Sequence, residues 1–142
     1  MRDSILIFFL IITLLITGCN DEFEDSKIIG NDFFQMEVPA TWHKISVAGY
    51  DSKVGGITNG KDTLTYDYGW YAANFDQISS DTHTRNETII DGYEAVIVSP
   101  KKKGRGIIGV FIQVDSLNKF NMHGKSKDKS TVLRIFESIT FE

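Results

Sequence analysis

One apolar segment opens this 142-residue chain, and the only cysteine stands at its end. Residues 5–16 are apolar at every position except Thr13. These 12 residues would form a helix of roughly 18 Å, whereas a hydrocarbon core of about 30 Å needs about 20 residues. The segment has the length of the hydrophobic region of a signal peptide, so we expect residues 1–18 to take no part in the folded domain.

The four residues that end this segment, I-T-G-C at positions 16–19, resemble the lipobox of bacterial lipoproteins. In that family the cysteine thiol receives a diacylglyceryl group, and a peptidase cleaves the chain just before the cysteine. The resemblance implies that Cys19 is lipidated and holds the protein on a membrane of the cell envelope, with the outer membrane or the cell surface favoured. The alternative is an uncleaved membrane anchor that contains an incidental cysteine.

An acidic run follows the cysteine. Residues 20–26 read N-D-E-F-E-D-S and have little apolar surface to bury, so we expect a solvated spacer. We assign residues 19–27 to the lipidated cysteine and this acidic tether, and residues 28–142 to a single domain. A second interpretation makes the run a sorting signal, because it resembles the surface-export signals of Bacteroidetes-type lipoproteins.

Composition bounds the character of the domain. Hydrophobic residues make up 42% of the chain and aromatic residues 12%, which is ample for a packed core. With no cysteine after Cys19 the domain has no disulfide and depends on that core alone. The formal net charge of −4 argues against nucleic acid as a partner, since nucleic-acid binding favours a basic face.

Alternation of apolar and polar residues predicts a domain rich in strands. Asn59-Gly60 and Asp91-Gly92 are typical of tight hairpin turns, although Lys61-Asp62 can lengthen the first one. Ala40-Thr41-Trp42, directly after Pro39, indicates a turn that returns a large aromatic side chain to the core. Strands are expected at residues 32–38, 44–47, 54–58, 63–70, 87–90, 93–99, 107–114 and 120–123.

The last element is expected to be a helix. Four apolar residues fall at i, i+3, i+4 and i+7, the stripe of an amphipathic helix that docks on a sheet: Val132, Ile135, Phe136 and Ile139. Ser126 or Asp128 can cap the N-terminus of this helix. The expected fold class is therefore α+β, an antiparallel sheet backed by a C-terminal helix.

Three short segments resemble the PsbP/DcrB-like fold: V-P-A-T-W at 38–42, D-G-Y-E-A at 91–95 and I-F-E-S-I-T-F at 135–141. The resemblance implies an antiparallel sheet backed by helices and a non-enzymatic accessory domain that is often lipid-anchored. The chain departs from the pattern, because the early helix of that fold is reduced here to a turn near Trp42. No metal or partner site of that family can be carried over to this sequence.

Motifs for catalysis and metal binding are missing from the sequence. It contains no G-x-S-x-G, no H-E-x-x-H and, once Cys19 is lipidated, no free thiol. His43, His83 and His123 lie far apart, and Asp81-x-His83 is the one spacing that could place two ligands side by side. We expect no enzyme activity, no catalytic residues, no cofactor and no metal.

Two segments supply candidate binding residues. The first is an aromatic run, and Tyr and Trp provide the rigid contact area that binding sites favour: Tyr66, Tyr68, Trp70, Tyr71 and Phe75. The opposing interpretation places this run on the inner face of the sheet, with Tyr71 and Phe75 as the members expected to be exposed.

The second segment is a cationic turn that Lys125, Lys127 and Lys129 extend: Lys101, Lys102, Lys103 and Arg105. This turn is either a solvated hairpin tip or a contact for anionic headgroups or polysaccharide.

These observations predict a lipid-anchored cell-envelope protein whose domain binds or scaffolds a protein partner without catalysis. The alternative function is a small-ligand or glycan-binding module that uses the aromatic run at residues 66–75.

Overall fold

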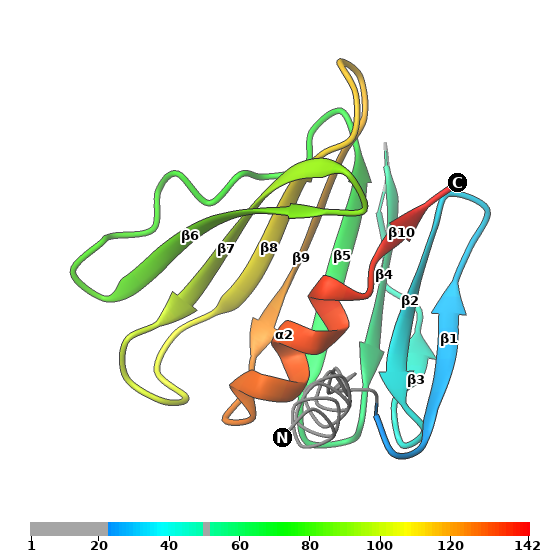
Figure 1. The fold of residues 1–142 in the computed structure, drawn as a ribbon, viewed down its shortest axis with the longest axis horizontal. Helices are drawn as coiled ribbons and strands as arrows, with labels where there is room; N and C mark the ends of the chain where they lie inside the picture. The colour runs from blue at the N-terminus through cyan, green and yellow to red at the C-terminus, as the bar shows by residue number, and fades with distance from the viewer. Residues whose placement is uncertain (1–22, 50–51) are drawn as a thin grey trace, which may run out of the picture.

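The computed structural model describes residues 23–49 and 52–142 of the chain, which form two antiparallel β-sheets and one helix (Figure 1). The small sheet has the strand order β1-β2-β10: β1 (Ser26–Gly30), β2 (Phe34–Pro39) and β10 (Thr140–Phe141). The large sheet has the order β3-β4-β5-β9-β8-β7-β6: β3 (His43–Ile45), β4 (Lys53–Thr58), β5 (Thr63–Gly69), β6 (His83–Ile90), β7 (Tyr93–Pro100), β8 (Ile108–Gln113) and β9 (Lys119–Lys125). The helix, α2, spans Lys129–Glu137.

The expected α+β class, and with it the PsbP/DcrB-like architecture, is wrong. Strands account for 49% of the described residues and the single helix for 8%, so the domain is mostly β. The apolar stripe located the C-terminal helix, but a second sheet covers the large sheet together with this helix. The second sheet includes β1, which begins at Ser26 inside the segment assigned to the tether.

The large sheet consists of two meanders that meet side by side. Strands β3 to β5 pair in chain order, strands β6 to β9 do the same, and β5 then pairs with β9. Because β6 lies at the far edge, the connection of residues 70–82 must cross from the middle of the sheet to that edge. This connection runs over the face of the large sheet opposite the small sheet, which we call the outer face.

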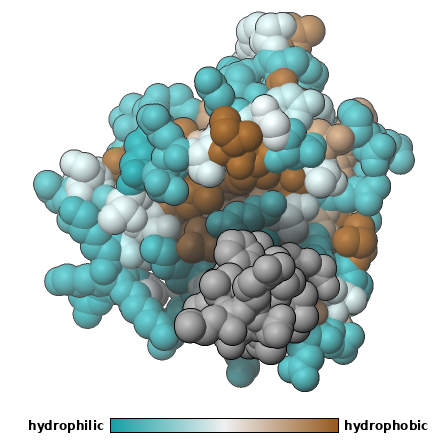
Figure 2. All heavy atoms as spheres, viewed as in Figure 1, coloured by the Kyte–Doolittle hydropathy of each residue, from teal (hydrophilic) through white to brown (hydrophobic). Residues whose placement is uncertain are grey.

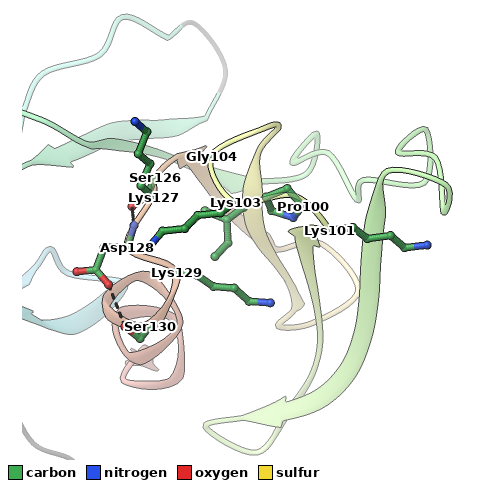
Figure 3. A pocket seen from close by; sticks show the side chains of 10 residues that line it. Pro100, Lys101, Lys103, Gly104, Ser126, Lys127, Asp128, Lys129 and Ser130 are labelled. Atoms are coloured by element: carbon green, nitrogen blue, oxygen red, sulfur yellow. Dashed lines mark hydrogen bonds between the residues drawn. The ribbon is translucent and has the colours of Figure 1, made fainter.

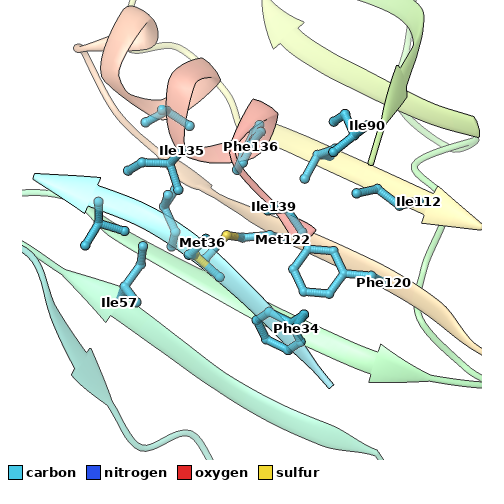
Figure 4. Close-up of a cluster of buried hydrophobic side chains, with 14 of the residues drawn as sticks. Phe34, Met36, Ile57, Ile90, Ile112, Phe120, Met122, Ile135, Phe136 and Ile139 are labelled. Atoms are coloured by element: carbon cyan, nitrogen blue, oxygen red, sulfur yellow. The ribbon is translucent and has the colours of Figure 1, made fainter. Parts of the chain in front are cut away.

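The core fills the space between the two sheets and α2 (Figure 4). Phe34 of β2 is 1% exposed, and its ring meets Phe120 of β9 edge-on at 4.8 Å between centroids. Ile135 and Phe136 of α2 are fully buried against the same layer. Polar residues cover the periphery on the α2 side of the molecule, and hydrophobic residues gather between α2 and the β6–β7 hairpin (Figure 2).

Local turn and cap chemistry follows the sequence closely. Asp91 (φ 50°) and Gly92 (φ 82°) both adopt left-handed conformations, which confirms the tight turn between β6 and β7. The first hairpin has a four-residue loop instead, because the Asn59 N–H donates to the Asp62 carbonyl at 3.2 Å. Trp42 is 2% exposed, as its position after Pro39 predicts.

The folded chain reaches further towards the N-terminus than expected. The Arg134 guanidinium of α2 lies 4.0 Å from the centroid of the Phe23 ring, so Phe23 already contacts the domain. The predicted signal at residues 1–18 and the predicted lipidation site Cys19 lie outside the described residues. Within residues 23–49 and 52–142 no helix has the length and apolarity needed to cross a membrane.

Candidate binding surfaces

The structure divides the aromatic run between two faces of the large sheet. Tyr66 and Tyr68 project from β5 onto the inner face, where both rings lie beside Phe34 at centroid distances of 4.9 and 6.3 Å. Trp70 and Tyr71 follow the end of β5 and are 51% and 75% exposed. The run is therefore not one surface, and only these last two residues are available to a partner.

The expectation that Phe75 is exposed is wrong. Phe75 is 8% exposed, adopts a left-handed φ of 63°, and packs onto the outer face against His123 at 5.9 Å between ring centroids. Close by, the Asn121 side chain of β9 donates to the Ala73 carbonyl at 2.9 Å. The ring packing buries apolar surface of Phe75, and the hydrogen bond satisfies the buried Asn121 N–H group, so both contacts hold the connection of residues 70–82 on the sheet.

His123 is a half-buried base on the outer face. Burial lowers the pKa of its imidazole, since the cation is poorly solvated beneath Phe75. Its Nδ1 atom finds no hydrogen-bond partner among the described residues. No cluster of three or more metal-ligand side chains occurs in residues 23–49 and 52–142, so His123 stands apart from any such group there.

A groove crosses the rest of the outer face. It consists of two adjoining hollows that share Phe111 and Gln113 of β8. One hollow, of about 590 Å³, lies over β6 and β7 and adds acidic and apolar residues: Glu87, Ile89, Glu94 and Val96. The other, of about 440 Å³, lies beside the start of the crossing connection and adds Trp70, Tyr71, Asn74 and Lys119. We call this continuous surface the outer-face groove.

Strand β6 borders the groove and forms a free edge of the large sheet. Its pairing with β7 closes at Ile90 and Tyr93 around a two-residue turn, so alternate residues from Ile90 backwards bond to β7. Arg85, Glu87 and Ile89 therefore direct their backbone N–H and C=O groups away from the sheet. No strand within the described residues pairs with that side of β6.

Cationic side chains gather at the opposite end of the molecule from Trp70. The turns after β4 and β7 and the segment before α2 all lie at the lower end in Figure 1. Two hollows there, lined from these three segments, share Gly104, Ser126, Lys127 and Asp128. We call the cations on these segments the basic cluster: Lys61, Lys101, Lys102, Lys103, Arg105, Lys125, Lys127 and Lys129.

The basic cluster surrounds the N-terminus of α2 (Figure 3). Lys103 extends from the β7–β8 turn towards Asp128, and Lys129 projects into the hollow between them. Asp128 caps the helix by accepting from the Thr131 N–H at 3.2 Å, and the Thr131 hydrogen bonds lower the pKa of its carboxyl, with a smaller contribution from Lys103. One carboxylate is thereby committed to the helix, and the lysines around it remain exposed.

The sequence pointed to part of each surface. It singled out the cationic turn and the lysines before α2, and the structure brings these two segments together with Lys61. Of the outer-face groove it singled out only Trp70 and Tyr71, because that groove combines β6, β7, β8 and the crossing connection. The available signal was Val96, an apolar residue on the side of β7 opposite the core residues Ala95 and Ile97.

Comparison of the chain with protein-family models and with curated proteins finds no match. Function is therefore inferred from the two surfaces described above.

Proposed function

We propose that this chain is a lipid-anchored cell-envelope protein whose domain binds an extended segment of a protein partner, without catalysis. The observation that carries the proposal is the free edge of β6 beside the outer-face groove. An added strand would satisfy the outward backbone groups of β6, and its alternate side chains would enter the groove. The anchoring half rests on the sequence at residues 16–19.

The chemistry of the groove specifies the segment that fits it. Ile89, which is 62% exposed, together with Val96 and Phe111 offers apolar contact, and Glu87 and Glu94 stand beside them. A partner strand with apolar side chains and at least one Lys or Arg would match both features. The other edge strands are shorter than the eight residues of β6, since β1 has five, β3 three and β10 two. Of these edges, β6 is the one that borders the outer-face groove.

Backbone pairing can be tested with a proline that removes one outward donor. The Glu87 N–H points away from β7, so Glu87→Pro leaves the β6–β7 ladder intact, and proline is tolerated at strand edges. The matched control, Glu87→Ala, removes the same side chain and keeps the N–H. If β6 pairs with a partner, the full-length protein carrying Glu87→Pro recovers much less partner than Glu87→Ala, which loses only the carboxylate contact. Equal recovery by both variants would reject strand pairing.

Site-specific crosslinking provides an independent measurement. A photoreactive residue at position 89 should crosslink to the partner in intact cells, and the same residue at position 28 should not. Ile28 is the matched control, because it is also 62% exposed and also lies on an edge strand, but it does not line the outer-face groove. Equal adducts at both positions would indicate nonspecific capture.

The anchoring half needs a separate measurement. The native protein should begin at Cys19 and carry the mass of a diacylglyceryl group, which intact-mass spectrometry of the membrane fraction measures directly. A native protein that begins at Met1 would reject the anchor. The comparison of Glu87→Pro with Glu87→Ala would then still test the binding surface.

A glycan is the second candidate ligand, favoured by the exposed ring of Trp70 beside the amide side chains of Asn74 and Gln113. Aromatic faces stack on sugars, and amides bond to hydroxyl groups. Lys119 Nζ already lies 5.6 Å from the Trp70 ring centroid, and a sugar would have to displace it from that face. Loss of binding in Trp70→Ala together with retention in Glu87→Pro would select the glycan.

A further inference from the structure

We propose that the basic cluster rests on the anionic headgroups of the membrane that holds Cys19, so that one end of the domain faces the bilayer and β6 and the groove remain open to a partner. This inference rests on the proposed anchor and deepens it by fixing the orientation of the domain. Three observations carry it: where the chain enters the domain, how short the link to Cys19 is, and how the charges are distributed.

The chain enters the domain at the end that carries the basic cluster. Phe23 packs on Arg134, which lies five residues along α2 from Lys129. Five residues of helix rise about 7.5 Å. β1 begins at the same lower end of the molecule in Figure 1, near the turn after β4. A membrane attached through residue 19 therefore approaches the domain from the side of the lysines.

The link between anchor and domain is short. Only three residues lie between Cys19 and Phe23, and the four Cα-to-Cα steps from one to the other span at most about 14 Å when the chain is fully extended. Charges on the domain act on headgroups over a Debye length of about 8 Å at physiological ionic strength. With so short a link, the end of the domain around α2 stays close enough to the headgroups for them to attract its lysines electrostatically.

The charges of the domain are segregated. The chain has a formal charge of −4 with 15 Lys and Arg residues, yet eight of these cations lie in the basic cluster. The segments that carry the cluster contain two carboxylates, and both are engaged: Asp62 accepts from Ser126 Oγ at 2.7 Å, and Asp128 caps α2. Asp81 is a third carboxylate nearby, because the carbonyl of the next residue accepts from the Lys101 N–H. The acidic residues at 21–25 oppose contact with an anionic membrane, but the cluster outnumbers their four carboxylates by two to one.

Lysine footprinting on vesicles tests the orientation. The full lipidated protein is purified from membranes in detergent and reconstituted into vesicles of phosphatidylcholine alone or mixed with phosphatidylglycerol. A membrane-impermeant amine reagent then modifies exposed lysines, and mass spectrometry reports each site. Labelling of Lys103 and Lys127 should fall by about fivefold on the anionic vesicles, the factor expected for a lysine held at an anionic surface, and should recover in high salt.

The chain supplies its own internal controls. Lys53 and Lys119 flank Tyr68 and Gly69 at the far end of β5, so their labelling should be the same on both kinds of vesicle. Charge reversal at Lys101, Lys103 and Lys127 should abolish the protection without releasing the protein from vesicles, whereas reversal at Lys53 and Lys119 should leave it unchanged.

The outcomes separate the two proposals. A protein that fails to float with neutral vesicles, where only acyl chains can hold it, contradicts the anchor. A protein that floats but shows equal labelling of the cluster on neutral and anionic vesicles overturns the orientation alone. Protection on both vesicles that disappears in Asp21→Asn/Glu22→Gln would mean that the tether itself covers the cluster, which also overturns it.

Discussion

The ring of Phe75 lies directly over Gly109 of β8, so closely that a Cβ added at Gly109 would come within 2.6 Å of Phe75 Cζ. Gly109 pairs with His123 on β9, whose ring forms the other side of the same contact. Because position 109 has no side chain, the outer face has a depression there, and the Phe75 ring of the crossing connection fills it. One glycine thus determines where residues 70–82 cross the outer face and how much of that face stays open.

Gly109→Ala should destabilise the domain by about 1–3 kcal/mol, the usual cost of inserting a methyl group into a filled site. The methyl group would push the Phe75 ring away, because the rigid strand β8 cannot yield. Urea denaturation monitored by tryptophan fluorescence measures the loss. In the background of Phe75→Ala the same substitution should have little effect, and a full additional loss in the double variant would contradict the contact.

His123 should make stability depend on pH near neutrality. Burial lowers its folded-state pKa below the ordinary value of 6.5, so below that pH the unfolded chain binds the proton first. The free energy of unfolding should therefore be fully present above pH 6.5 and fall as the pH drops towards the folded-state pKa. Asp115 and Asp128, whose lowered pKa values affect stability only in more acidic solution, do not contribute in this window.

The check is a comparison of denaturation at pH 7.5 and pH 5.5 in the wild type and in His123→Gln, which cannot titrate there. The wild type should lose stability between these two conditions, and the variant should lose less. An identical pH dependence in both proteins would assign it to another group.

How far the sequence predicted the fold depended on how local each interaction is. Asp91-Gly92, the Asp128 cap and the apolar stripe of α2 act over a few residues, so their patterns could be read directly. The small sheet depends on contacts across the whole chain, since Gln35 pairs with Thr140. Its first strand also lacks alternation, because Ile28 and Ile29 are adjacent and follow an acidic run.

Prediction of the candidate surfaces likewise succeeded where neighbouring residues form the surface and failed where distant segments meet. Lysines 101–103 form a run that any reading of the sequence detects, and antiparallel pairing of β8 with β9 brings them near Lys125. The aromatic run was misjudged because its regular spacing suggested a single face. β5 ends at Gly69, so Trp70 leaves the pattern, and the burial of Phe75 follows from a crossing that only the strand order of the large sheet imposes.

The N-cap of α2 should make a measurable contribution to stability. Asp128 accepts hydrogen bonds from the Thr131 N–H at 3.2 Å and from Ser130 Oγ at 2.9 Å. Asp128→Ala should cost about 1 kcal/mol, the usual value for losing such a cap, whereas Asp128→Asn should keep most of the stability. Equal losses in the two variants would show that charge, and not capping, stabilises this end of the helix.

Phe34 should be among the most sensitive positions in the core, because its side chain joins the two sheets. It is 1% exposed on β2 and contacts the rings of Tyr66 and Phe120 in the large sheet at 4.9 and 4.8 Å. Phe34→Ala should cost about 3–5 kcal/mol, and Phe34→Leu, which leaves a smaller cavity, should cost less and remain folded for measurement. Ile28→Ala on the neighbouring strand is the control, since an exposed side chain should change stability by no more than about 0.5 kcal/mol. A loss at Phe34 no larger than at Ile28 would mean that the small sheet does not pack on the large one as described.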